Sequence, residues 1–134
     1  MAAQKISDLS VGDWVRYNGK EYTIASIYMA AEGYPHEAEL TYQGISCGCV
    51  YIGHLQPIPI TAEILEKNGF KRSTSQFIVY HTDKVWISYD KPSETWSVTM
   101  YINDNTSNLH ANILHIHELQ HALRLAGVDK EINL

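Results

Sequence analysis

Apolar and polar positions alternate over short stretches in the second half of the chain, and this period of two predicts half-buried β-strands. In residues 96–102, the apolar side chains occupy every second position and are separated by Ser, Thr and Tyr. Residues 76–80 and 84–89 are two further apolar stretches, and turn-forming residues follow at 90–93. We expect a three-stranded antiparallel meander here, followed by a polar loop at residues 103–108.

Short apolar stretches also fill the first half of the chain and predict a small β-rich lobe over residues 1–60. Residues 13–17 and 20–27 flank Asn18-Gly19. This dipeptide is the strongest short-range signal for a β-hairpin, because both central residues of the turn need positive φ. Further strands are expected, after a loop, at residues 37–42 and 47–52.

Helical periodicity occurs in two places. Thr61 is a suitable N-cap for a short helix at residues 62–68. A longer amphipathic helix is predicted within residues 113–127, where apolar residues recur at three- and four-residue spacing: Ile116, Leu119, Ala122, Leu123 and Ala126. Packed on the meander, this helix completes a second lobe at residues 61–134. The expected fold class is therefore α+β, with both lobes in one compact unit.

The C-terminal helix carries the one local pattern with catalytic potential, His117-Glu118-Leu119-Gln120-His121. It matches the H-E-x-x-H pattern of zinc metalloproteases. Residues four apart lie on one helix face, so His117 and His121 could bind one zinc ion while Glu118 acts as general base on a bound water. On a helical wheel both histidines fall opposite Leu119 and Leu123, so we expect them to face solvent or a cleft.

A catalytic zinc ion usually has a third protein ligand, and the sequence does not supply an evident one. The place of the third histidine in the extended pattern holds Gly127. His110 would lie about 10.5 Å along the helix from His117, and His115 would point about 160° away from it. Donors from elsewhere in the chain stay open as alternatives: His36, His54 and His81. We expect no catalytic residue, metal or cofactor; the alternative is a zinc-dependent metallohydrolase with Glu118 as general base.

Composition narrows the classes of partner. The chain of 134 residues has a net charge of −5 and a pI of about 5.7, which disfavours a generic binder of the phosphate backbone. A protein partner is therefore favoured over a nucleic acid. The apolar runs are far shorter than a membrane span, so no membrane partner is expected. Residues 1–5 lack the apolar core of a secretory signal, which favours the cytoplasm.

Cys47 and Cys49 flank Gly48 and are the only cysteines in the sequence. Two cysteines are too few for a disulfide framework or a four-thiolate zinc site. In a regular strand they would point to the same side. We expect free thiols in a reducing compartment, and a two-thiol metal clip or a redox pair is the alternative.

Aromatic strand residues near the start of the chain suggest a binding surface. The segment Val11-Gly-Asp-Trp-Val15, followed by a hairpin, resembles the opening of SH3-like barrels, including Tudor and KOW modules. The resemblance implies a small SH3-like barrel in the first lobe. In such a barrel Trp14, Tyr17 and Tyr22 would line a groove for a peptide or nucleic acid. The alternative is that these rings belong to the core.

A second resemblance covers three segments: residues 8–12, 55–70 and 116–127. Its most specific parts are the block Pro-Ile-Pro-Ile-Thr, which leads into the short helix ending at Asn-Gly-Phe, and the closing His-x-Leu-Gln helix. These parts are similar to an uncharacterised family of small proteins from prophages and mobile elements of gut anaerobes. The family implies no particular activity.

In that family Gln often stands at the position of Glu118 and Asn at that of His121. The resemblance thus implies a structural use for His117, Leu119 and Gln120. We expect a non-enzymatic accessory or interaction protein derived from a phage or mobile element. The alternatives are the zinc-dependent hydrolase and an SH3-like module that binds nucleic acid or peptide.

Overall fold

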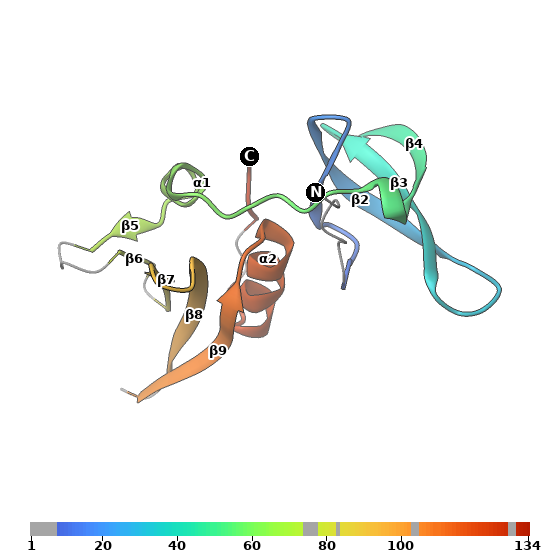
Figure 1. Ribbon diagram of the computed structural model, residues 1–134. Coiled ribbons are helices and arrows are strands. Elements are labelled where there is room, and N and C mark those ends of the chain that lie inside the picture. The colour runs from blue at the N-terminus through green and yellow to red at the C-terminus, as the bar shows by residue number, and fades with distance from the viewer. Residues whose placement is uncertain (1–7, 74–77, 83, 103–104, 129–130) are drawn as a thin grey trace. The chain divides into compact units, whose positions relative to one another are not determined.

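The computed structural model describes residues 8–73, 78–82, 84–102, 105–128 and 131–134. The chain divides into two compact units, Met1–Ile58 and Pro59–Leu134. Each unit is built on one antiparallel sheet, and the helices are few, so the α+β class is confirmed (Figure 1). The strands in the described ranges form open sheets and do not close into the barrel expected for the first lobe.

The strands of the first unit follow one another in space as they do in sequence, in the order β1-β2-β3-β4. Their bounds are Trp14–Tyr17, Lys20–Met29, Pro35–Tyr42 and Ile45–Tyr51, and the 3₁₀ turn η1 follows at Ile52–His54. Asn18 and Gly19 both have positive φ, 49° and 77°, so they form the tight hairpin turn that the sequence predicts.

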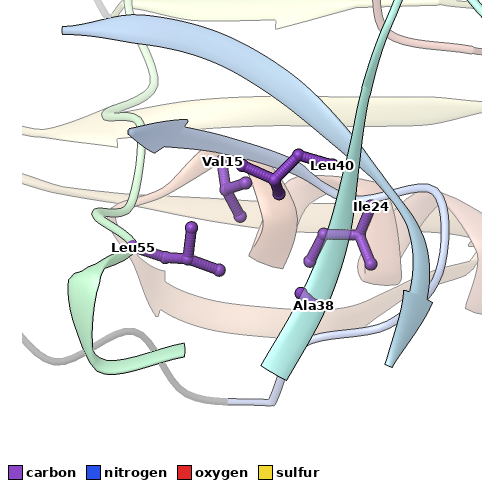
Figure 2. Packing of buried hydrophobic residues seen from close by; sticks show 5 residues of the cluster. All are labelled: Val15, Ile24, Ala38, Leu40 and Leu55. Atoms are coloured by element: carbon purple, nitrogen blue, oxygen red, sulfur yellow. The ribbon is translucent and has the colours of Figure 1, made fainter. Parts of the chain in front are cut away.

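One face of the first sheet is buried by a small apolar cluster, which Figure 2 shows at close range. Its members are at most 2% exposed: Val15, Ile24, Ala38, Leu40 and Leu55. The other face carries polar side chains that contact one another across the strands. Glu39 accepts hydrogen bonds from the hydroxyls of Ser26 and Ser46, at 3.3 and 2.8 Å, because cross-strand neighbours on one face lie within reach of each other.

The second unit contains a sheet in the order β5-β6-β7-β8-β9. Its strands are Lys71–Arg72, Val79–His81, Val85–Asp90, Thr95–Ile102 and Asn105–Ile113. The expected meander corresponds to β6, β7 and β8, and it is extended on both sides by β5 and β9. The first residues of the strand expected at 76–80 lie outside the described ranges.

Strand β9 corrects the sequence-based prediction most clearly. Residues 105–113 pair with β8, where a polar loop and the start of a helix were expected. The segment is rich in Asn, Ser and Thr and lacks regular alternation, so its strand conformation comes from hydrogen bonding to β8 rather than from its own propensity. Asn112, with φ of 59°, lies in a bulge of β9, between the pairs that His110 and Ile113 form with β8.

The two α-helices belong to the second unit. Helix α1, Ala62–Lys67, begins where the Thr61 hydroxyl accepts a hydrogen bond from the Ile64 backbone, as predicted. Helix α2, Ile116–Leu125, begins three residues later than residue 113, because β9 takes the preceding residues. Four residues of its predicted apolar stripe are buried: Ile116, Leu119, Ala122 and Leu123.

Candidate functional site

The histidines of the H-E-x-x-H pattern differ in exposure. His117 is only 2% exposed and His121 is half-buried, so the expectation that both face solvent or a cleft is wrong for His117. The helical-wheel prediction assumes that only the apolar stripe is buried. At the start of α2 the buried surface is wider than this stripe, since Gln120 is also buried, at 9% exposure. The rings of His117 and His121 meet edge to face at 5.9 Å.

His115 is also placed differently from the prediction. It is the N-cap of α2, with extended backbone angles, and so it does not follow the helical wheel. Its ring stacks on that of His117, with centroids 5.8 Å apart and planes 9° apart. The statement that His115 points about 160° away from His117 is therefore wrong. Three imidazoles do gather around the start of α2.

Glu118 points its carboxylate back toward the start of the helix. Its Oε1 accepts hydrogen bonds from the backbone N–H groups of Leu114 and His115, at 3.2 and 3.1 Å. The same oxygen lies 3.0 Å from Nδ1 of His115. This is the N3 position of a capping box, where an acidic side chain satisfies N–H groups that have no partner within the helix. Glu118 thus has a structural use that requires no bound water or metal.

A metal centre needs several donors that converge on one point. Among the described residues, no three or more His, Cys, Asp or Glu side chains are placed so that they could hold a metal ion. The carboxylate of Glu118 contacts the His115 ring and the backbone at the helix start. These contacts are the ones expected of a capped helix start.

The aromatic residues Trp14, Tyr17 and Tyr22 do not form one surface. Val15 pairs with Tyr22, and both Tyr17 and Tyr22 pack partly buried against the core of the first unit. Trp14 pairs with Thr23, and by strand alternation it belongs to the opposite face. The pleat of the hairpin therefore places Trp14 on one face and Tyr17 and Tyr22 on the other, whereas the sequence suggested one groove for all three.

Cys47 and Cys49 are exposed free thiols in β4. Cys49 pairs with Glu39 and Ser46 pairs with Thr41, so β4 has two residues between these pairs where β3 has one. This β-bulge breaks the alternation of the strand. The expectation that both thiols point to the same side rested on that alternation, so the bulge removes its basis.

A cluster that the sequence did not reveal lies at one end of the first sheet. Tyr34, His36, Tyr51 and His54 form a chain of rings, which we call the aromatic row. Successive centroids are 6.5, 5.3 and 5.3 Å apart, and all contacts are edge to face. Tyr34 and Tyr51 are 52% and 50% exposed, and both histidines are exposed as well. The residues come from separate elements, so no local pattern indicates the row.

Gly53 leaves room for the Tyr51 ring of the aromatic row. A Cβ atom at Gly53 would collide with the ring of Tyr51. The missing side chain therefore allows Tyr51 to lie close to the backbone of η1, between the rings of His36 and His54.

The surroundings of the aromatic row are acidic. Glu37 pairs with Tyr51 across the strands, and Glu32 lies two residues before Tyr34; both carboxylates are exposed. The sequence contains no Lys or Arg between Lys20 and Lys67. This surface therefore combines aromatic rings with negative charge.

Comparison with known proteins identifies no relative. No protein-family model matches the chain, and neither a curated protein nor a solved structure matches it significantly. In the described ranges, no helix has the length and apolar character needed to cross a membrane.

Proposed function

We propose that the protein is a non-enzymatic interaction protein that binds a basic segment of a protein partner through the aromatic row. The observation that carries the proposal is the exposed chain of four rings around Tyr51. Large aromatic side chains are the residues that most often anchor protein interfaces, because they bury much area and lose little conformational entropy.

Charge favours a basic partner over an acidic one. The rings of Tyr34 and Tyr51 can accept a Lys or Arg side chain on their faces, since the π-system attracts cations. Glu32 and Glu37 add negative charge beside these rings, and residues 21–58 contain no cation of Lys or Arg type that would repel the partner. Complementary charge of this kind speeds encounter and selects among partners.

The zinc hydrolase has less support. Its general base would be Glu118, whose carboxylate is already bonded to the backbone at the start of α2. Its first ligand would be His117, which is 2% exposed and so offers little access to substrate. We therefore propose no catalytic role for this helix.

We include the location and the origin of the protein in the same proposal. A cytoplasmic location, an origin in a phage or mobile element, and the SH3-like resemblance of the opening segment all describe a small accessory protein. Such a protein acts by binding to a partner, and an exposed aromatic surface suits that role.

Peptide binding provides the test. A fluorescein-labelled ten-residue peptide of Lys, Arg and Leu is titrated and its anisotropy followed, beside a matched peptide with Glu at each basic position. We expect the wild-type protein to bind only the basic peptide. Tyr51→Ala should weaken binding by about 10-fold or more, as loss of an interface anchor does. Gly53→Ala should weaken it too, because the new Cβ displaces the Tyr51 ring.

The matched control is Tyr42→Ala. Tyr42 is 52% exposed, on the same sheet, but lies outside the aromatic row. We expect this variant to bind as wild type does. Equal binding of the basic and acidic peptides by the wild type, or equal losses for Tyr42→Ala and Tyr51→Ala, would overturn the proposal.

A further inference from the structure

The second sheet places four residues in a line across its strands. Lys71 pairs with His81, His81 with Trp86, and Trp86 with Thr99. We call these four residues the cross-strand line. The neighbouring pair Tyr80 and Ile87 is buried, at 1% and 0% exposure, in the core of the second unit. Side chains alternate between the two faces of a strand, so the cross-strand line belongs to the face opposite that core.

This face presents an indole and positive charge together. Trp86 is 43% exposed, and the ring of His81 lies 5.8 Å from it at a tilt of 36°. Lys71 is exposed, and so is Lys84, which comes directly before β7 at the same end of the sheet. Adjacent strands are about 4.8 Å apart, so Lys71 and Trp86 are separated by about 10 Å across the sheet.

Acidic groups of the same hairpin lie at its other end. Asp90 ends β7, and Glu94 comes directly before β8. Lys84 comes before β7 and Asp90 ends it, and Lys91 follows Asp90 in the β7–β8 turn. Lys71 and Lys84 are thirteen positions apart in the sequence, and the pairing of β5, β6 and β7 brings their segments to the same part of the sheet.

We propose that the face of the cross-strand line binds single-stranded nucleic acid. A base stacks on Trp86, and phosphates on either side are bound by Lys71 and Lys84. A partly exposed aromatic ring on a sheet face, flanked by cations, is suited to unpaired bases, since every base has a π-face. A duplex keeps its base planes stacked on one another and exposes only their edges, so it cannot use the indole in this way.

This proposal is independent of the partner-binding one. It concerns the other unit of the chain, a different ring and charge of the opposite sign. Variants of the aromatic row should leave it unaffected, so the two proposals can fail separately.

Anisotropy of labelled oligonucleotides tests the proposal. Fluorescein-labelled (dT)15, (rU)15 and a 15-base-pair duplex are titrated with the full chain at 50 mM salt. We expect binding of the single strands and much weaker binding of the duplex. Trp86→Ala should weaken single-strand binding by about 5- to 150-fold, the range for loss of one stacked base. Lys71→Ala should reduce the salt dependence, lowering the slope of log K against log salt by about 0.7.

Two controls make the outcome decisive. Lys91→Ala removes an exposed lysine from the β7–β8 turn, away from the cross-strand line, and should bind as wild type does. Long-chain polyphosphate carries charge without bases and should compete poorly with (dT)15. Circular dichroism checks the fold of each variant; if Trp86→Ala fails to fold, Lys84→Glu replaces it and is expected to weaken binding at least as much as Lys71→Ala.

Three results would overturn the proposal. The first is no wild-type binding to either single strand. The second is wild-type affinity in both Lys71→Ala and Lys84→Glu. The third is competition by polyphosphate equal to that by unlabelled (dT)15, which would reduce the site to a general polyanion surface.

Discussion

At the scale of single residues, Glu118 illustrates how a catalytic pattern and a capping pattern coincide. A helix start has N–H groups without partners and a partial positive charge, and both favour a carboxylate at the N3 position. Glu118 occupies that position and bonds to the backbone of Leu114 and His115. In H-E-x-x-H the same residue type stands one position after the first histidine. The pattern alone does not separate these two uses of Glu118.

The capping role predicts a loss of stability on truncation. Glu118→Ala should lower the free energy of unfolding by about 0.5–2 kcal/mol, the usual effect of losing a cap. Glu118→Gln should cost less, since an amide oxygen can still accept from the backbone. Urea denaturation measures both. Glu66→Ala, an exposed position in α1, is the control and should change stability by less than about 0.5 kcal/mol. Unchanged stability of Glu118→Ala would contradict the capping role.

At the scale of elements, one side chain connects the end of the chain to α1. The Nδ2 group of Asn68 donates to the backbone oxygens of Ile64 and Asn133, at 2.7 and 2.8 Å. Its Oδ1 accepts from the backbone N–H of Asn133, at 2.7 Å. Asn68 is 7% exposed, and Ile132 beside this contact is 3% exposed. The amide therefore pairs with the last residues much as a neighbouring strand would.

Asn68→Ala should free this C-terminal contact. Loss of hydrogen bonds at a buried position costs about 1–3 kcal/mol, because the backbone groups of Asn133 lose their partner. Hydrogen exchange at Asn133, with urea denaturation of the whole chain, measures the effect. Asn133→Ala is a matched control, since both bonds use the Asn133 backbone and survive the change. A similar loss of protection in the two variants would show that the Asn68 amide is not what holds the segment.

At the scale of the whole molecule, the two units use their sheets in the same way. Each buries one face of its sheet and exposes the other, so each has a solvent-exposed face that can bind a partner. The first unit exposes acidic groups with tyrosines, whereas the second exposes lysines beside Trp86. The core of the first unit is small: its buried cluster consists of the five residues that Figure 2 labels.

Leu40→Ala should therefore destabilise the first unit strongly. Leu40 is 1% exposed, and truncation of a buried leucine costs about 2–5 kcal/mol through lost burial and the cavity left behind. Hydrogen exchange read by mass spectrometry should show lost protection in β1 to β4. Ile45→Ala is the control on the same sheet, at 70% exposure, and should lose little. Equal effects of the two changes would mean that this cluster does not stabilise the unit.

Local patterns were sufficient for the elements whose cause is local. The Asn18-Gly19 turn, the Thr61 cap and the apolar stripe of α2 depend on turn chemistry and periodicity over a few residues, and the structure confirms all three. The α+β class follows from the same patterns. These features are determined by the sequence alone because neighbouring residues create them.

Only the tertiary structure decided the remainder. Strand β9 exists because β8 supplies hydrogen-bond partners to a polar segment. A bulge in β4 breaks the alternation on which the prediction for Cys47 and Cys49 rested. The aromatic row and the cross-strand line join residues from different strands and turns. Strand register brings such residues together, and register depends on pairing between distant segments, so no local pattern could reveal either surface.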